Sequence, residues 1–402
     1  MPVRKASRFT AVFIGGSGYH NDSGPPCRYP PARVRVKRMR SDVIAAQKRL
    51  GRKTVVALPV HYPAELFTAM DVHVVELWGP PGPPRGPDAG RIQPYVCAVV
   101  RNALAFLAHG GARDADALLF PHTCDSIQGM ATLVPDFGGW GKPVLRYFHP
   151  KGEDRPAARE LIRAELASLS AALERLTGRT LDTHRLAQAV ALHAEIHRLR
   201  GALLSRRSCL ALTDPELYRL LRRGEYLWPE DHLSELVEAA KLLGGEPVRT
   251  GVPLMVTGYV PEPMTLLDLL ESAGAFLGAD DYAAVGRRVP LRAPDDGDDP
   301  LAILAARPFA LPPCPTRGNG RERRMDHLES LYRGAGAAGI VIHVPKFCEP
   351  EAFDVPAIRS RFAKIGAPQL FLEGELEIRL SGQAATRIEA FVETVRAGRA
   401  AS

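Results

Sequence analysis

The sequence predicts an α/β protein with two Rossmann-like domains, each built on a doubly wound, mostly parallel sheet, and a helical insert between them. Strand and helix patterns alternate in two separate regions, as expected for parallel strands joined by crossover helices. The stretch between these regions has leucines at helical spacing and no strand signal. The predicted segments are an atypical N-terminal segment (1–35), a first domain (36–154), the insert (155–245) and a second domain (246–402).

The first domain is predicted from short apolar runs, which fit buried strands, and from helical patterns between them. In chain order the expected elements are a helix over 36–50, a strand over 53–58, a helix from about Pro63, a strand over 73–77, a turn-rich loop over 79–90, a helix around 95–110, and strands over 115–120 and 143–148.

Leucine spacing predicts the helices of the insert. One apolar stripe contains Leu166, Leu169, Leu173 and Leu176, and a second contains Leu192, Ile196, Leu199 and Leu203. His184, His193 and His197 lie among these stripes, and the last two are one helical turn apart. A metal site is one interpretation of that pair, but no third ligand is nearby, so solvated or capping histidines are expected.

The second domain repeats the construction of the first. Apolar runs at 253–258, 338–344 and 367–375 predict strands, and the segment 383–398 predicts a final helix. Pro, Gly and Asp-rich stretches between them predict long loops.

Composition excludes several classes of protein. The net charge is +7, but the basic run "RVRVKRMR" has no interleaved aromatic residues, so a nucleic-acid partner is not expected. No apolar run reaches the length of about 18 residues that a membrane helix needs, and no cleavable leader is evident, so a cytoplasmic protein without a membrane contact is expected. The six cysteines have no CxxC spacing, which argues against a disulfide scaffold or a zinc ribbon.

Two cysteines follow predicted strands at equivalent places in the two domains. Cys124 follows "ALLFPHT" and Cys348 follows "IVIHVPKF", and each precedes residues suited to opening a helix. The carboxyl ends of parallel strands border the ligand crevice of such sheets. Amide groups at a helix start are expected to lower the thiol pKa and to favour the thiolate, the form that binds metal.

Cys97 could approach the same crevice from the start of the helix predicted around 95–110 in the first domain. Three thiolates from separate loops, without a histidine partner, suit an iron-sulfur site better than a catalytic dyad, and they would leave one position of a cubane open. The alternative is that these three thiols are incidental and bind no cluster. Cys27 and Cys209 fit a ligand role poorly, and Cys314, in the loop "PPCPTRG", is the most interesting of the remaining cysteines.

The segment "IGGSGYHN" (14–21) lacks the spacing of a nucleotide-binding loop, and no Walker A motif is present. Any ATP requirement would therefore be met by another protein.

Six blocks of the sequence match one known family in order: "VHYPAELFTAM" (60–70), "YVCAVVRNAL" (95–104), "ALLFPHTCDSIQ" (117–128), "VIHVPKFCEPEAFDVPAIR" (341–359), "APQLFLEGE" (367–375) and "GQAATRIEAFVE" (382–393). They resemble the blocks of the 2-hydroxyacyl-CoA dehydratase and benzoyl-CoA reductase family. The resemblance extends from about residue 36 to the C-terminus.

The resemblance implies one [4Fe-4S] cluster per chain, held by Cys97, Cys124 and Cys348, with the fourth iron open to water or to the thioester carbonyl. It also implies a sister subunit, as heterodimer or homodimer, and an ATP-dependent iron-sulfur activator that injects one electron. In such a dehydratase a ketyl radical of the 2-hydroxyacyl-CoA expels the hydroxyl group, whereas the benzoyl-CoA branch reduces an aromatic ring. A non-catalytic cluster-bearing electron-relay subunit is a further alternative.

The resemblance also suggests roles for three other residues. Glu65, in "YPAEL", is expected to hydrogen-bond near the cluster or to move a proton, with a helix-start acid as the alternative. Gln383 and Arg387 are expected to contact the substrate or to join the domains, with a structural ion pair as the alternative for Arg387. A family branch with a double cluster has extra cysteines near the first and last blocks. Because "LPVHYP" has none and "KFCEP" has one, a single cluster is expected.

Overall fold

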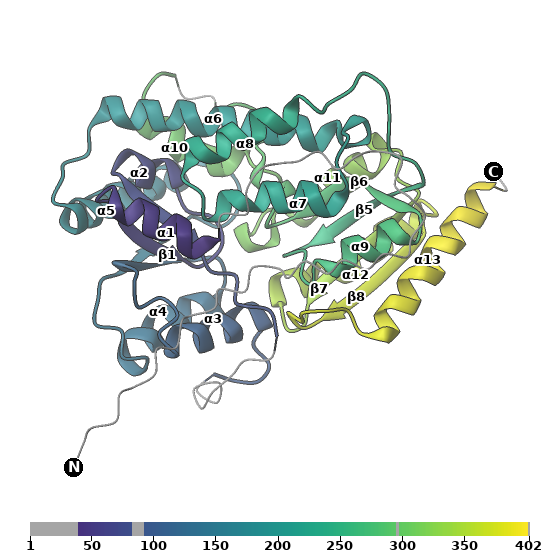
Figure 1. The fold of residues 1–402 in the computed structure, drawn as a ribbon, viewed down its shortest axis with the longest axis horizontal. Helices are drawn as coiled ribbons and strands as arrows, with labels where there is room; N and C mark the ends of the chain where they lie inside the picture. The colour runs from purple at the N-terminus through teal and green to yellow at the C-terminus, as the bar shows by residue number, and fades with distance from the viewer. Residues whose placement is uncertain (1–38, 83–91, 295–296, 401–402) are drawn as a thin grey trace, which may run out of the picture.

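The computed structural model describes residues 39–82, 92–294 and 297–400 (Figure 1). The predicted N-terminal segment, Cys27 and most of the loop 79–90 lie outside these residues. Two all-parallel four-stranded sheets form the framework. The first has the order β2-β1-β3-β4, with β1 (Lys53–Ala57), β2 (Val72–Glu76), β3 (Ala117–Pro121) and β4 (Val144–Tyr147). The second has the order β6-β5-β7-β8, with β5 (Val252–Gly258), β6 (Ala275–Tyr282), β7 (Gly339–Pro345) and β8 (Gln369–Gly374).

The predicted fold class is therefore confirmed, and the two sheets share one strand order. All five positions of β3 and all seven of β7 are buried, as expected for strands covered on both faces. In each sheet the direction in which successive strands are added changes between the two central strands, β1 and β3 or β5 and β7. Such a switch point opens a crevice beyond the carboxyl ends of these strands.

Helices cover both faces of the first sheet. The helices encoded before β4 are α1 (Arg40–Arg49), α2 (Ala64–Ala69), α3 (Ala98–Ala108) and α4 (Asp125–Phe137). Figure 1 shows α3 and α4 on the opposite side of β1 from α5 (Pro156–Thr177) and α6 (Thr183–Ser205). The leucine stripe of α5 packs on the sheet, because Leu166 and Leu169 share a core with Val55 and Leu119.

The helical insert does not form a separate lobe. Besides α5 and α6 it contains η2 (Arg207–Cys209), α7 (Asp214–Arg222), η3 (Arg223–Glu225) and α8 (Pro229–Ala240). Helix α8 packs along α6, and α7 packs against α9 (Thr265–Ser272) of the second half. The insert thus completes the first sheet and also contacts the second. The boundaries at 155 and 245 stay a prediction.

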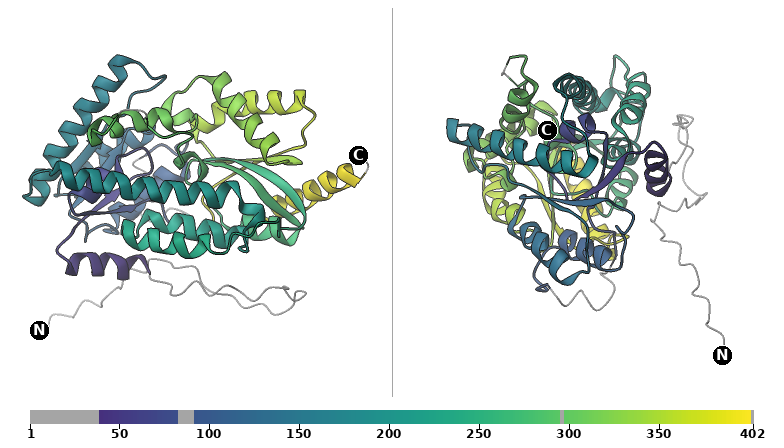
Figure 2. Two further views of the ribbon diagram at one scale, coloured as in Figure 1. Left: turned by 90° about the horizontal axis from the view of Figure 1, so that it is seen from above. Right: turned by 90° about the vertical axis from the view of Figure 1, so that its left-hand side faces the viewer.

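One helix crosses between the halves. Helix α10 (Pro300–Ala310) is encoded in the second half but packs against α5 and α6 beside the first sheet. The second sheet is covered by α9, α11 (Arg321–Gly334), α12 (Glu349–Lys364) and α13 (Gly382–Ala400), with η4 (Gly286–Arg288) and η5 (Pro315–Arg317) in the connections. Figure 2 shows that α13 ends far from α1. Among the described helices, none has both the length and the apolar character needed to cross a bilayer.

Gly258 is the last residue of β5 and is paired with His343 of β7. A Cβ atom at this position would collide with the carbonyl oxygen of His343. Gly258→Ala is therefore expected to lower the free energy of unfolding by about 2 kcal/mol or more, since the backbones of two central strands must separate. Urea denaturation checks this.

The matched control is Gly374→Ala at the end of β8, where a Cβ atom meets nothing within 4 Å. Equal stability of the two variants would contradict the prediction.

Candidate active site

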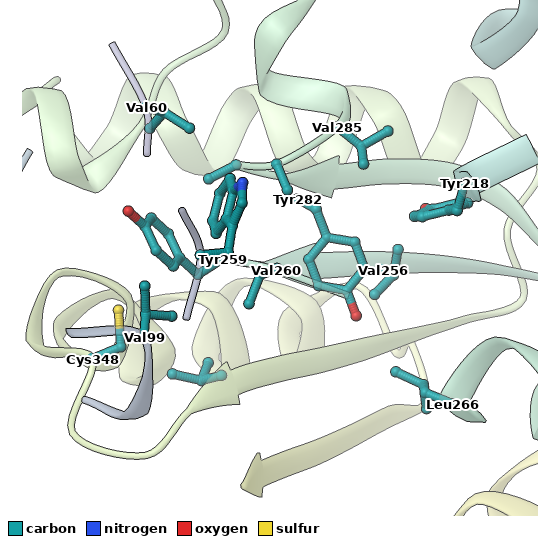
Figure 3. Close-up of a cluster of buried hydrophobic side chains, with 14 of the residues drawn as sticks. Val60, Val99, Tyr218, Val256, Tyr259, Val260, Leu266, Tyr282, Val285 and Cys348 are labelled. Carbon is teal, nitrogen blue, oxygen red and sulfur yellow. The ribbon is translucent and has the colours of Figure 1, made fainter. Parts of the chain in front are cut away.

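The three predicted cysteines occupy equivalent local positions, directly before helices. Cys97 is the N-cap of α3, Cys124 of α4 and Cys348 of α12. Cys124 and Cys348 also follow corresponding strands, β3 and β7. All three line one small cavity, with Tyr259, Thr316 and Pro350 also in its wall. Figure 3 shows Cys348 beside Val99 and Tyr259 in the buried core. The structure therefore brings together the three thiols that the sequence analysis grouped.

The protonation of the thiols is decided by their contacts with one another and by burial. A hydrogen bond from Cys348 lowers the pKa of Cys97, and the backbone amides of Val100 and Val99 lower it further. The same bond, with burial, raises the pKa of Cys348. Burial raises the pKa of Cys124 to about 11.

The expectation that the helix starts favour thiolate is thus wrong for Cys124 and Cys348. Desolvation of the charged form outweighs the nearby amides there. A bound metal would reverse this balance, because a coordinating thiol is deprotonated by the ion's charge.

The donor set fits a cluster better than a single ion. Within residues 39–82, 92–294 and 297–400, no three His, Cys, Asp or Glu side chains are close enough to hold one metal ion. In a cubane each cysteine thiolate binds a different iron. The cavity between the thiols has a volume of about 10 Å³. The thiol chemistry and its three separate helix starts fit such a group.

A second, larger cavity lies beside the thiols and has a volume of about 170 Å³. Its polar wall comes from both halves of the chain: His61, Glu65, Glu76, His149, His193, His197, Arg200, His232, Arg287, Arg288, Arg307 and Arg317. Glu65 lies here, buried and paired with Arg307 of α10, and not in the wall of the thiol cavity. Glu76 pairs through both carboxylate oxygens with Arg288, at 2.7 Å each.

The two cavities share a wall. Thr316 lines the thiol cavity, and its Oγ1 lies 2.7 Å from Nε2 of His61, which lines the larger cavity. Arg317 donates to Nδ1 of His61 (3.3 Å), so Nε2 carries the proton and donates to Thr316. His61 has a φ of 64°, a left-handed conformation that is costly for a non-glycine residue and is often found at functional sites.

Cys314 lies behind this wall and is buried. Its Sγ is 2.9 Å from Oγ1 of Thr316 and 3.5 Å from Nη1 of Arg287. Burial alone raises its pKa, but Arg287, Arg317 and Arg324 outweigh burial and lower the pKa to about 7. Cys314, which stood out among the remaining cysteines of the sequence, thus lies close to the site. It does not line the thiol cavity.

His193 and His197, expected to be solvated or capping residues, are half-buried and line the larger cavity. Burial lowers the pKa of His193 to about 4 and that of His197 to about 3. His184 is exposed, as expected. The α6 pattern placed these residues on a helix, but only packing against α2 and α8 encloses the pair.

A buried ion-pair network anchors the helix that carries Cys348. Arg287 of η4 pairs with Asp281 at the end of β6 and with Glu351 in the first turn of α12. Arg324 of α11 pairs with Asp281 (2.9 Å) and with Asp354 of α12 (2.8 Å). These four contacts join four elements of the second half, η4, β6, α11 and α12, and hold the start of α12 in place.

Gln383 and Arg387 lie on α13, outside the walls of both cavities. Both are exposed, and Arg387 donates to the carbonyl of Phe371 (2.7 Å). Their substrate contact stays a prediction, as does the role of Glu65. Cys209 lies in η2, partly buried and outside both cavities.

Most residues of the larger cavity had no recognisable signal in the sequence. Arg200, His232, Arg287, Arg288 and Arg317 each looked like an ordinary helix or loop residue. His61 is the exception, because it lies within the block "VHYPAEL" and could have been singled out there.

Comparison with known proteins gives one family. The family described as "2-hydroxyglutaryl-CoA dehydratase, D-component" matches residues 59–395. The lactoyl-CoA dehydratase subunit beta of Anaerotignum propionicum is 24% identical, over 85% of this chain and 92% of that protein. The (R)-2-hydroxyglutaryl-CoA dehydratase subunit beta of Acidaminococcus fermentans is 23% identical, over 88% and 95%. A benzoyl-CoA reductase subunit of Thauera aromatica is 24% identical, over 80% and 85%.

The matched region contains every strand of the two sheets except β1, together with the three thiols and the larger cavity. The chain therefore belongs to the 2-hydroxyglutaryl-CoA dehydratase D-component family.

Proposed function

We propose that the chain is the cluster-carrying subunit of a 2-hydroxyacyl-CoA dehydratase and removes water from a 2-hydroxyacyl-CoA to give the enoyl-CoA. One [4Fe-4S] cluster would be held by Cys97, Cys124 and Cys348. A sister subunit would complete the enzyme, and an ATP-dependent iron-sulfur activator would deliver the electron that starts the reaction. The observation that carries this proposal is the convergence of three N-cap thiols on one buried cavity at the switch points of two matching sheets.

When bound, the cluster would supply an iron with an open position, which acts as Lewis acid and one-electron relay at the thioester carbonyl. The chain's own residues would bind and orient the acyl group. Tyr259, 3% exposed, and Thr316, 2% exposed, exclude bulk water from the thiol side. His61 presents an imidazole at the shared wall, where the acyl chain would pass from one cavity to the other.

A proton must accompany the departing hydroxyl group. Glu65 and His61 both line the larger cavity and are candidates for holding it. Burial lowers the pKa of His61 well below its usual value, with Arg317 and Lys151 adding to the effect, so the imidazole is neutral at pH 7 and carries one proton, on Nε2. The Glu65 carboxylate is paired with Arg307 and is better suited to fixing the position of that arginine.

The alternative is a component of an aromatic acyl-CoA reductase, which the similarity to the benzoyl-CoA reductase subunit of Thauera aromatica favours. The two functions differ in the product. Dehydration gives an enoyl-CoA from a 2-hydroxyacyl-CoA without net reduction, whereas ring reduction consumes electrons with each turnover. The two functions can be distinguished by supplying both kinds of thioester to the protein together with its activator and any co-purifying subunit. The product then identifies the function.

Single replacements of the thiols test the cluster. Anaerobically isolated protein is expected to contain about four irons and equal sulfide per chain. Cys97→Ala, Cys124→Ala and Cys348→Ala are each expected to lose most of this iron and the dehydratase activity. Iron analysis, acid-labile sulfide and electron paramagnetic resonance of the reduced protein are the measurements.

Cys209→Ala is the matched control, since that thiol lies outside both cavities. Circular dichroism separates loss of the cluster from loss of the fold. A wild-type protein that is folded but holds no iron after reconstitution would contradict the proposal, as would equal iron loss in Cys209→Ala.

A further inference from the structure

Two side-chain hydroxyl groups lie in the wall of the thiol cavity, those of Tyr259 and Thr316. Apart from the three cysteines, the other described side chains in this wall are apolar: Val99, Val100, Ile127 and Pro350. Among the side chains of this wall, only the two hydroxyls can therefore donate a hydrogen bond to a group held by the thiols. They differ in what they already contact.

The hydroxyl of Thr316 is engaged within the protein. Its Oγ1 accepts from Nε2 of His61 (2.7 Å) and lies 2.9 Å from Sγ of Cys314. Thr316 is also one of the groups that lower the pKa of Cys314, as expected of a hydroxyl that donates to a thiolate. Both contacts lie on the side of Thr316 that faces away from the three cluster thiols, because neither His61 nor Cys314 lines the thiol cavity.

The hydroxyl of Tyr259 is free by comparison. No side-chain hydrogen bond within residues 39–82, 92–294 and 297–400 involves it, although the residue is only 3% exposed. It is also not one of the unpaired polar atoms that are sealed from any accessible surface, such as Oγ1 of Thr54. Tyr259 lines the thiol cavity and does not line the larger one, so we assign the free surface of its hydroxyl to the thiol side.

The position of the Tyr259 ring is fixed by its surroundings. The residue directly follows β5 at the switch point of the second sheet, and its carbonyl accepts from the amide of Ala284 (3.0 Å). Its ring packs against that of Trp78, with 5.3 Å between the ring centroids. Figure 3 shows the hydroxyl pointing away from Tyr282, toward the end of the core where Cys348 lies. The phenol is thus held in place without using its proton.

We propose that the hydroxyl of Tyr259 donates a hydrogen bond to the group held by Cys97, Cys124 and Cys348 and raises the reduction potential of that group. This inference rests on the proposed function, because it takes a [4Fe-4S] cluster as the group. Hydrogen bonds to the sulfurs are one of the means by which a protein sets the potential of a cluster. The reduced cluster carries one more negative charge than the oxidised cluster, so a donor stabilises it more strongly and makes uptake of the electron easier.

Replacing Tyr259 with phenylalanine tests the inference, because the ring that packs against Trp78 is kept and only the hydroxyl is removed. Anaerobic redox titration with a europium(II) chelate, followed by electron paramagnetic resonance, measures the potential. At a given potential, Tyr259→Phe is expected to lower the ratio of reduced to oxidised cluster about tenfold, which for one electron is a shift of about 59 mV to more negative values. Tyr332→Phe, on α11 and outside both cavities, is the matched control and should leave the potential unchanged.

A second measurement separates a direct hydrogen bond from a change in packing. Electron-nuclear double resonance of the reduced protein in H2O and in D2O detects exchangeable protons coupled to the cluster. One strongly coupled proton of the wild type is expected to be missing in Tyr259→Phe and present in Tyr332→Phe. Iron content and circular dichroism of both variants should match those of the wild type.

The possible failures can be told apart. An unchanged potential in a Tyr259→Phe protein that holds its cluster would overturn the inference and leave the proposed function intact. A more positive potential would assign the tyrosine as an iron ligand through its phenolate, and loss of iron would assign it a structural role; either result overturns the inference. A folded wild-type protein that holds no cluster after reconstitution would overturn both the inference and the proposed function.

Discussion

Lowering the pH from about 7.5 to about 5 is expected to remove most of the protein's stability, because the fold buries an unusual set of neutral histidines. His149, His232 and His343 are at most 4% exposed. Burial lowers the pKa of His232 to about 3 and that of His343 to about 4, and it holds the pKa of His149 well below its ordinary value. Around the larger cavity His193 and His197 behave in the same way.

The direction of the effect follows from proton binding in the two states. An unfolded histidine takes up a proton below about pH 6.5, whereas these folded imidazoles stay neutral. The unfolded chain therefore binds more protons, and stability is complete above about pH 6.5 and falls as the pH drops toward the folded pKa values of 3 to 4. Below about pH 6.5 each such histidine costs about 1.4 kcal/mol per pH unit, so His149, His232 and His343 together cost about 4 kcal/mol per pH unit. A domain is typically stable by only about 5–15 kcal/mol.

Urea midpoints measured anaerobically at several pH values check the prediction. His232→Gln is expected to make the pH dependence less steep by about one proton, or about 1.4 kcal/mol per pH unit. His184→Gln, at an exposed position of α6, should leave the slope unchanged. A midpoint that is constant between about pH 7.5 and 5.5 would show that the buried imidazoles do not control acid stability.

Replacing Arg287 with methionine is expected to lower the free energy of unfolding by about 3–5 kcal/mol. Arg287 is 1% exposed and is shared by Asp281 and Glu351. Burial alone would raise the pKa of Asp281, but Arg287 and Arg324 outweigh it and hold that pKa far below its usual range. Without Arg287 these carboxylates stay buried with less compensation, and methionine fills the space without supplying charge.

Denaturant midpoints at pH 7 measure the loss. The matched control is Arg333→Met, which removes an exposed pair with Glu329 on α11 and should cost no more than about 0.5 kcal/mol. Iron content provides a second readout, since Glu351 lies in the first turn of the helix that Cys348 precedes. If the Arg287→Met variant is as stable as the Arg333→Met variant, the buried ion-pair network does not stabilise the fold as predicted.

Much of the fold could be predicted because its signals are local. Strand β3 is an uninterrupted apolar run, and β1 and β7 are mostly apolar, as expected for strands that are covered on both faces. The alternation of strands and helices then dictates parallel pairing and crossover connections. The packing of α10 against the first sheet had no local signal, because it joins residues that are distant along the chain.

The thiol site was accessible to sequence reasoning for a related reason. Each cysteine stands at a junction before a helix, two of them directly after a strand, and the carboxyl ends of parallel strands converge on a crevice whatever the side chains are. The thiol pKa values were not accessible, since they depend on burial and on the contact between Cys97 and Cys348. Desolvation is a property of the assembled core and not of the helix start.

By itself, then, the sequence determined the two matching sheets, the apolar stripes of the helices and the thiols at the helix starts. These features depend on the spacing of residues that are close together along the chain. Tertiary structure alone decided the larger cavity. Its wall joins α2, α6, α8, η4, α10 and η5, and its arginines and histidines gain their unusual character only when packing removes them from water.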